Sequence, residues 1–252
     1  MTTYSTLSAE FYDLTDHINN AEATAFFMKK AREAQGPILE PMCGAGRFLI
    51  PMLQAGLDVE GFDASQAMID RFFQKCAGSG LAQPHVWKEF VQNFKSDRTY
   101  GLIFIPYGSW GLVTNRADAL QGLHTLHTHV APQGFLILEI ETVASVPQTS
   151  LGIPHRGVRI RTDGTKITLD TRASYSLKNQ LFESVCHYES IIDGQIVATE
   201  DELFQQYLYR ESELEVLLYE AGFTQVKKFP AYNETRMVDV NTPIIIYECS
   251  KD

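Results

Sequence analysis

The chain has 252 residues, 44% of them hydrophobic, and a formal net charge of −10. This length suffices for one large α/β domain or for a domain that carries an insertion. The negative charge balance, with no run of Lys or Arg, disfavours an extended nucleic acid as a partner, because neutralising phosphates requires a basic face. No stretch approaches the roughly twenty apolar residues of a membrane span, so we expect no membrane insertion.

The N-terminal segment and the cysteines favour a cytoplasmic protein. The segment "MTTYSTLSAEFYDL" lacks a positive region followed by an apolar core, so we expect no signal peptide. Reduced thiols and the absence of an iron–sulfur cluster are expected because the cysteines are scattered and form no C-x-x-C pair. The four cysteines are Cys43, Cys76, Cys186 and Cys249.

The first part of the chain predicts helices that alternate with buried strands. An amphipathic segment at 8–16 precedes a helix at 19–36, which ends at a glycine. The segments that follow are strand 37–41, a turn at 42–46, helix 47–56, strand 57–62, helix 65–80, strand 85–90, strand 100–106, helix 116–130 and strand 135–141. Strands this apolar are typical of a parallel sheet that is covered on both faces, and the alternation predicts a doubly wound α/β fold.

Residues 143–210 predict an antiparallel insertion. Apolar and polar residues alternate strictly between 157 and 209, and Asp163-Gly164 and Asp193-Gly194 stand where hairpin turns belong. The helix "ESELEVLLYEAGF" and the strands "TQVKKF" and "PIIIYECS" then resume the first pattern and bring the main sheet to seven strands. We therefore divide the chain into a core, 1–142 and 211–252, and an insertion, 143–210, one side of which faces solvent or a ligand.

The stretch "ILEPMCGAGRFLIPMLQAGLDVEGFDAS", residues 38–65, carries the strongest ligand signal. A glycine turn between a strand and a helix brings backbone N–H groups close to a ligand. A dinucleotide site would need a third glycine where Leu49 stands. Glu40, before the turn, would repel a pyrophosphate but suits a cationic amine, and Asp63 ends the next strand, where a carboxylate can accept both ribose hydroxyls. Together these features describe S-adenosylmethionine better than NAD.

The motifs resemble those of the class I S-adenosylmethionine-dependent methyltransferases. "LEPMCGAGR" looks like the first motif of that family, "GFDASQAMI" like the second, and "HVAPQGFLILEI" like the Pro-x-Gly turn before strand five. The resemblance covers nearly the whole chain and says little about the substrate. One departure is Met42, which stands where the family has its first glycine; we expect altered packing there rather than lost binding.

The resemblance implies a set of cofactor-binding residues. Glu89 falls where the family has an acid that contacts adenine, with Phe90 beside the ring, and a surface role for Glu89 stays open. Tyr12, and with it Tyr4, resembles a lid residue, although packing within an amphipathic helix is the alternative. The full set is Tyr12, Glu40, Met42, Gly44, Gly46, Asp63, Ala64, Met68, Glu89, Phe90 and Phe104.

The insertion resembles that of small-molecule methyltransferases related to sugar-amine and glycine N-methylating enzymes. In those proteins the antiparallel sheet covers the active site and often supports dimers, which implies a possible homodimer here. The segment "IPYG" lacks the polar residue and second proline of methylases that act on nucleobases or glutamine. The implied substrate residues are Ser109, Trp110, Arg159, Tyr175 and Tyr207, and His187 is a candidate base, with Tyr and Glu residues of the insertion as rivals.

A metal site is not expected. His124 and His127 share a helix face, but His129 turns away, and no neighbouring Cys or carboxylate completes a ligand set. The sequence predicts an enzyme that transfers a methyl group from S-adenosylmethionine to a nitrogen or oxygen of a small acceptor by in-line displacement. The alternatives are a protein or RNA methyltransferase, a non-catalytic cofactor-binding protein and a nicotinamide oxidoreductase.

Overall fold

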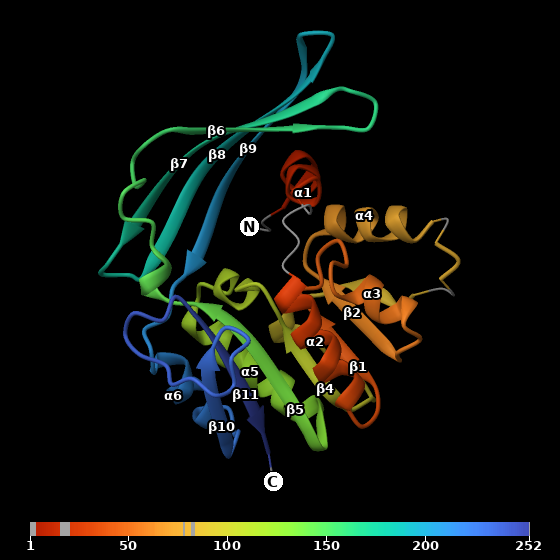
Figure 1. Cartoon of the computed structure of the whole chain (residues 1–252), viewed down its shortest axis with the longest axis vertical. Coiled ribbons are helices and arrows are strands. Elements are labelled where there is room, and N and C mark those ends of the chain that lie inside the picture. The colour runs from red at the N-terminus through yellow and green to blue at the C-terminus, as the bar shows by residue number, and fades with distance from the viewer. Residues whose placement is uncertain (1–3, 16–20, 78, 82–83, 252) are drawn as a thin grey trace.

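A computed structural model of the chain describes all residues except 1–3, 16–20, 78, 82–83 and 252. Two sheets organise it (Figure 1). A seven-stranded sheet has the order β10-β11-β5-β4-β1-β2-β3, and a separate four-stranded sheet has the order β6-β7-β8-β9. Both sheets were predicted from the residue pattern, and the fold class is confirmed.

The seven-stranded sheet is mostly parallel. Its strands are β1 (Ile38–Pro41), β2 (Val59–Asp63), β3 (Val86–Lys88), β4 (Tyr100–Ile105), β5 (Val130–Glu141), β10 (Gln225–Pro230) and β11 (Ile244–Ser250). Only β11 runs against its neighbours β5 and β10. The strand order reverses between β1 and β4, so the loops that follow these two strands diverge and open a crevice at their carboxyl ends.

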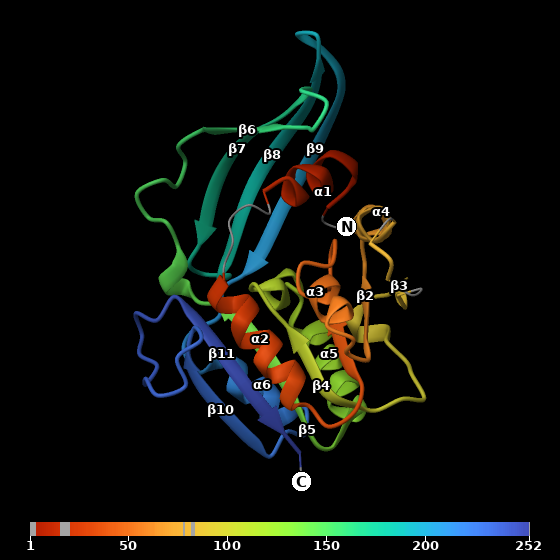
Figure 2. The ribbon, with the colours of Figure 1, turned by 45° about the vertical axis from the view of Figure 1, so that its right-hand side comes forward.

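Helices cover both faces of this sheet, and Figure 2 shows α2 across its near face. The helices are α2 (Ala21–Glu33), α3 (Leu49–Gln54), α4 (Gln66–Cys76), α5 (Arg116–His129) and α6 (Glu213–Glu220), with short 3-10 turns at η1 (Val91–Asn93), η2 (Ser109–Leu112) and η3 (Val143–Ser145). Strands β1 and β4 are buried along their whole length, as their continuous apolar runs require. Among the described residues, no helix has both the length and the apolarity needed to cross a membrane.

Strand β5 is longer than its sequence predicts. The expected strand began at residue 135, after a turn, but β5 already begins at Val130. Val130 pairs with Tyr100 of β4, and the pairing register then shifts before Leu102. The irregular register accommodates the residues that the sequence indicated as a turn.

The four-stranded antiparallel sheet stands over the carboxyl ends of the core strands (Figure 1). It comprises β6 (His155–Ile160), β7 (Lys166–Ser176), β8 (Leu181–Ile192) and β9 (Gln195–Tyr207). Asp193 and Gly194 have φ values of 50° and 77°, the left-handed pair that a tight hairpin of this kind requires. Along β8, Cys186 and Tyr188 are buried on the inner face, whereas Val185 is 65% exposed on the outer face.

Helix α1 (Thr6–Asp13) packs against the inner face of this sheet. The Glu200 carboxylate of β9 accepts hydrogen bonds from the backbone N–H groups of Leu7 (2.8 Å) and Ser8 (3.0 Å). These are free N–H groups of the first helical turn, so Glu200 satisfies them and also opposes the positive end of the helix dipole. Arg161 adds a two-bond ion pair with Glu10, at 2.7 Å and 2.9 Å.

The other side of α1 contacts the core. Asp13 accepts hydrogen bonds from Arg71 (2.9 Å) and Lys75 (2.8 Å), both on α4. The Ser65 hydroxyl, at the start of α4, donates to the carbonyl oxygen of Tyr4. Helix α1 therefore bridges the antiparallel sheet and the core.

We predict that Glu200→Ala loosens α1. The substitution removes two charge-assisted hydrogen bonds, each contributing about 1.5–3 kcal/mol, so the α1 amides should exchange with deuterium at least about tenfold faster. Asp201→Ala is the matched control, because the Asp201 side chain is 83% exposed and lies on the outer face. Equal protection of α1 in the two variants would contradict the assigned role of Glu200.

Candidate functional site

A cavity of about 390 Å³ lies at the carboxyl ends of β1, β2 and β4. The loop after β1, the end of β2 and the loop after β4 form its walls, and Tyr4, Tyr12 and Asp13 of the N-terminal segment cover it. This is the crevice that the reversal of strand order predicts for a doubly wound sheet. The sequence signal of residues 38–65 therefore lies in this cavity.

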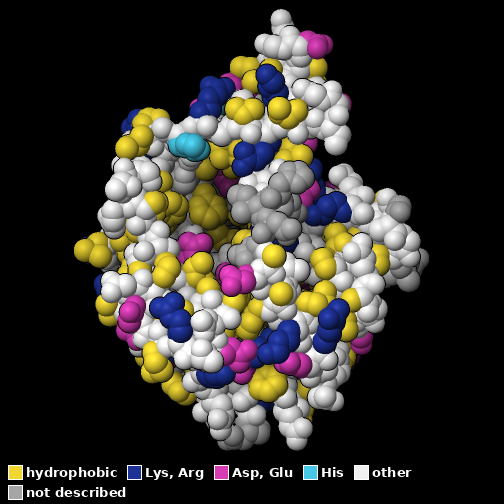
Figure 3. Space-filling view, viewed as in Figure 1, with side chains coloured by type: hydrophobic (Ala, Val, Ile, Leu, Met, Phe, Trp, Pro, Cys, Tyr) yellow, Lys and Arg dark blue, Asp and Glu magenta, His cyan; other side chains and the backbone are white. Residues whose placement is uncertain are grey.

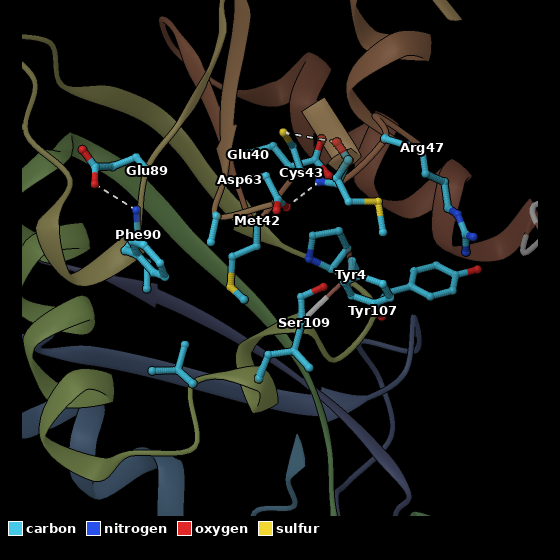
Figure 4. Close-up of a pocket in the computed structure, with 18 of the residues that line it drawn as sticks. Tyr4, Glu40, Met42, Cys43, Arg47, Asp63, Glu89, Phe90, Tyr107 and Ser109 are labelled. Carbon is cyan, nitrogen blue, oxygen red and sulfur yellow. Dashed lines mark hydrogen bonds between the residues drawn. The ribbon is translucent and has the colours of Figure 1, made fainter. Parts of the chain in front are cut away.

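Two carboxylates from neighbouring strands reach this cavity (Figure 4). Asp63 accepts hydrogen bonds from the backbone N–H groups of Gly44 and Ser65, both at 2.8 Å. Glu40 is 2% exposed, and its Oε2 atom has no hydrogen-bond partner among the described residues. Burial, and then the negative charge of Asp63, hold the pKa of Glu40 well above its usual range. A cationic ligand group would relieve both effects.

The backbone around the cavity is strained at three non-glycine residues. Tyr4, Met42 and Tyr107 have φ values of 65°, 59° and 57°, in the left-handed region that favours glycine. All three line the cavity. Met42 shows how the chain accommodates the missing first glycine of the motif: it adopts the glycine-like conformation despite its side chain. Strain of this kind concentrates at functional sites.

The two remaining glycines of the turn have different roles. Gly44 lines the cavity, and a Cβ there would lie 3.9 Å from the Met68 sulfur, which leaves room. Gly46 does not line it; a Cβ at Gly46 would lie 2.4 Å from the Phe72 ring. The expectation that Gly46 gives the ligand close approach is therefore wrong. Gly46 is needed for its φ of +80° and for the packing of the turn against α4.

Aromatic rings and a cation form one side of the cavity. The Arg47 guanidinium lies 4.5 Å from the centre of the Tyr107 ring and 5.2 Å from that of Tyr12. The ring of Tyr12 also packs on Tyr4 at 5.1 Å. Figure 4 shows Arg47 and Tyr107 on this side. Sequence reasoning did not single out Arg47, although it directly follows the glycine turn in "GAGR".

The opposite side of the cavity follows β3. Glu89 accepts a hydrogen bond from the N–H of Phe90 at 2.9 Å, and its own N–H donates to the Asp63 carbonyl oxygen at 3.0 Å. Phe90 is 40% exposed, with its ring at the cavity (Figure 4). A flat apolar group held between Phe90 and the end of β2 would place its polar edge near Glu89.

Most of the residues expected to bind the cofactor line this one cavity. Phe104 is the further exception besides Gly46: it is fully buried and packs on Phe27 and Phe48, with ring centres 5.4 Å and 6.4 Å away. Its side chain lies on the α2 side of β4, so the predicted contact with a ligand is wrong. The residues that do line the cavity are Tyr12, Glu40, Met42, Gly44, Asp63, Ala64, Met68, Glu89 and Phe90.

The residues expected to bind the substrate are dispersed. Ser109 lines the cavity, but Trp110 is fully buried in the core cluster of α5 and α6, so the expected opening of its side chain toward an acceptor is wrong. Arg159 lies over the Phe11 ring at 4.8 Å and donates to the Thr15 hydroxyl. It therefore fastens the N-terminal segment to the sheet.

Two tyrosines of the insertion also lie outside the cavity lining. The Tyr207 hydroxyl donates to Glu213 at 2.5 Å and borders a second, much smaller cavity of about 30 Å³. That cavity shares Val113 and Thr114 with the larger one. The Tyr175 hydroxyl is buried and has no hydrogen-bond partner among the described residues. Neither tyrosine contacts the space next to Ser109 directly.

The position of His187 contradicts the catalytic role expected for it. It lies on the outer face of β8, two residues from the exposed Val185, and its ring contacts the Asp201 carboxylate at 2.7 Å. That hydrogen bond raises the pKa of His187. The cavity lies beyond the inner face of the same sheet, so His187 cannot serve as a base there. The prediction failed because strict alternation does not reveal which face turns inward.

Several cavity residues carried no recognisable sequence signal. They come from the N-terminal segment, from the turn after β1, from α4 and from the segments after β3 and β4, and some lie inside quoted motifs without having been singled out. They are Asp13, Cys43, Ala45, Arg47, Phe48, Lys75, Val91, Gln92, Pro106, Tyr107, Leu112, Val113, Thr114, Asn115 and Asp118.

Solved structures of other proteins share this fold. An S-adenosylmethionine-dependent methyltransferase from Clostridium acetobutylicum has a TM-score of 0.79 at 18% identity, over 96% of this chain and 98% of that chain. The sugar N-methyltransferase KedS8 from Streptoalloteichus has a TM-score of 0.72 at 16% identity, over 96% and 93%. CalS10, an amino pentose methyltransferase from Micromonospora echinaspora solved with S-adenosylmethionine bound, has a TM-score of 0.68 at 14% identity, over 99% of each chain.

Sequence comparison identifies the family. A search of curated proteins found no match. A family model described as a methyltransferase domain matches residues 14–228, which is most of the chain. This match includes the glycine turn and both carboxylates of the cavity, and it confirms the family that the motifs predicted. The chain belongs to the methyltransferase-domain family.

Proposed function

We propose that the protein transfers the methyl group of S-adenosylmethionine to a nitrogen or oxygen atom of a small-molecule acceptor. The observation that carries this proposal is the pair of desolvated carboxylates, Glu40 and Asp63, in one cavity at the switch point of the sheet. A ligand that matches them has a cationic group and a diol at a fixed separation. S-adenosylmethionine has both, in its ammonium group and its ribose.

The residues present fit this cofactor along its length. Glu40, whose Oε2 atom lacks a partner among the described residues, would hold the ammonium group. Asp63, at the end of β2, would accept the ribose hydroxyls, and Phe90 with Glu89 would hold the adenine. The face of the Tyr12 ring suits a nearby positive charge. S-adenosylmethionine supplies a methyl group on a sulfonium, which leaves a neutral thioether when the methyl is transferred.

The protein's contribution to such a reaction is alignment and the exclusion of water. Asp63 fixes the cofactor loop, because its hydrogen bond to the Gly44 N–H joins the end of β2 to the turn after β1. Helix α1 covers the cavity and is held from both sides, by Glu200 and by Arg71 with Lys75. A leaving group that becomes neutral needs no anion-stabilising group.

A small acceptor fits the space between the two sheets. Figure 3 shows a hollow between the antiparallel sheet and the core, with hydrophobic side chains in its wall. The fold is shared with proteins described as a sugar N-methyltransferase and an amino pentose methyltransferase, which supports an acceptor of similar size. We also propose that the outer face of the antiparallel sheet, where Val185 and Leu203 are exposed, pairs two copies of the chain.

Asp63→Asn tests the cofactor site. The loss of one charge weakens two hydrogen bonds to the ribose, each contributing about 1.5–3 kcal/mol when charged, so the affinity for S-adenosylhomocysteine should fall at least about tenfold. Calorimetric titration measures this affinity. Asp70→Asn, on the exposed side of α4, is the matched control and should bind like the parent. Parental affinity in Asp63→Asn would disprove the proposed cofactor position.

The raised pKa of Glu40 predicts that cofactor binding releases a proton. In the free protein, burial and Asp63 favour the protonated carboxyl, whereas a bound ammonium group favours the carboxylate and lowers that pKa. Affinity should therefore rise as the pH increases toward the raised pKa of the free protein and level off above it. Calorimetry of S-adenosylmethionine binding in buffers of different ionisation enthalpy measures the released proton.

Two comparisons make the proton measurement specific to Glu40. Glu40→Gln should bind the cofactor without releasing a proton. Methylthioadenosine, which lacks the amino-acid part, should release none from the parent protein. Equal proton release from the parent and from Glu40→Gln would rule out Glu40 as the partner of the ammonium group.

A further inference from the structure

The carboxyl end of β5 carries two acidic side chains that the proposed cofactor site does not use. Glu139 and Glu141 follow Ile137 at intervals of two residues, so all three point to the same face of the sheet. Ile137 belongs to the apolar cluster of α2 and α3. The two acids therefore extend that face beyond the apolar core, toward the loop that follows β4.

Glu139 has a structural role. It is 3% exposed, accepts a hydrogen bond from the Tyr232 hydroxyl at 3.0 Å, and is also bonded by the backbone N–H of Tyr107. Burial raises its pKa, and these neutral donors oppose that effect. Glu139 thus holds the strained residue Tyr107 in place, and its carboxylate is occupied.

Glu141 is half-buried and is bonded only by neutral groups. The Ser145 hydroxyl lies 3.4 Å from its Oε2 atom, and the side-chain amide of Gln206 is its other partner. None of the ion pairs between described residues includes Glu141. A carboxylate held partly out of water without a cation is unfavourable, and a bound positive group or strong donor would compensate for it.

Glu141 lies next to the loop after β4, which contributes to the cavity wall. Gly108 lies between Tyr107 and Ser109, and both of these line the cavity. A side chain at Gly108 would approach the Glu141 Cγ atom to 3.2 Å and the Gln206 amide nitrogen to 3.1 Å. The absence of a side chain at Gly108 thus leaves Glu141 and Gln206 adjacent to the loop. Gln206 belongs to the inner face of β9, so this point lies where the antiparallel sheet meets the core.

We propose that Glu141 binds the acceptor and that the acceptor presents an amino group to it, an inference that rests on the proposed function. An N–H of the neutral amine donates to the carboxylate, which leaves the nitrogen lone pair free to face the methyl group. The N–C bond forms as the S–C bond breaks, the electron pair of the broken bond stays on sulfur, and the nitrogen becomes an ammonium. The carboxylate then stabilises that charge until a proton leaves to water.

The test compares amines with hydroxyl compounds of the same skeleton. The probes are 3-amino-3-deoxyglucose, 4-amino-4-deoxyglucose and benzylamine, each paired with glucose or benzyl alcohol. We expect the parent to methylate at least one amine and not its hydroxyl counterpart. In Glu141→Gln the KM for that amine should rise at least about tenfold, because a charge-assisted hydrogen bond is lost, and kcat should fall as well, because no carboxylate then stabilises the positive charge that develops on the nitrogen.

Two further variants separate binding from folding. Glu141→Asp, which keeps the charge, should recover part of the affinity for the amine. Glu183→Gln, on the outer face of β8 with a Gln205 partner, should keep the parental KM. All variants should bind S-adenosylhomocysteine as the parent does, since Glu141 lies outside the cofactor residues.

Each outcome decides one claim. An unchanged KM in Glu141→Gln, or a parent that binds S-adenosylhomocysteine but methylates none of the amines, would overturn this inference alone. A parent that fails to bind S-adenosylhomocysteine would overturn the proposed function itself.

Discussion

The desolvation of two neighbouring carboxylates is the constraint on which the candidate site depends. Glu40 and Asp63 lie at the carboxyl ends of adjacent parallel strands, so the sheet holds the two buried carboxyl groups close together at the cavity. Asp63 is partly compensated by the N–H groups of Gly44 and Ser65, but Glu40 retains an unpaired oxygen among the described residues. Without a ligand this arrangement costs free energy, and a cationic ligand recovers it. The same physical reason explains both the raised pKa of Glu40 and its proposed role.

Helix α1, which covers the cavity, is attached to the antiparallel sheet as much as to the core. Glu200 accepts hydrogen bonds at the start of α1 and Arg161 pairs with Glu10, while Leu7 and Phe11 pack against the inner face of the sheet. The inserted sheet therefore acts on the cofactor cavity indirectly, through the helix that closes it. It meets Glu141, the proposed acceptor-binding residue, at the end where Gln206 lies against the loop after β4.

The sequence predicted the fold correctly and singled out many residues that line one cavity, because both depend on local patterns. Buried strands appear as apolar runs, hairpins as Asp-Gly pairs, and the ligand turn as glycines between two acids. The predictions failed where the decisive factor was the orientation of a side chain. A continuous apolar run such as β4 contains no alternation, so nothing in it showed that Phe104 points into the core.

The acceptor side was harder to predict because it depends on how two sheets are placed. The alternation in β8 predicted that half of its residues face inward, but only the packing of α1 decides that Tyr188 does so and His187 does not. Trp110 was expected to contact the substrate, yet η2 turns it into the core. Glu141 was not singled out, because a single Glu at the end of an apolar strand carries no motif.

A crystal structure of the protein with S-adenosylhomocysteine bound is the most direct test of the account. We expect the amino group of the ligand within hydrogen-bond distance of Glu40 and both ribose hydroxyls on Asp63, with α1 closed over them. A ligand whose amino group and ribose contact neither carboxylate, or one bound outside this cavity, would contradict the account.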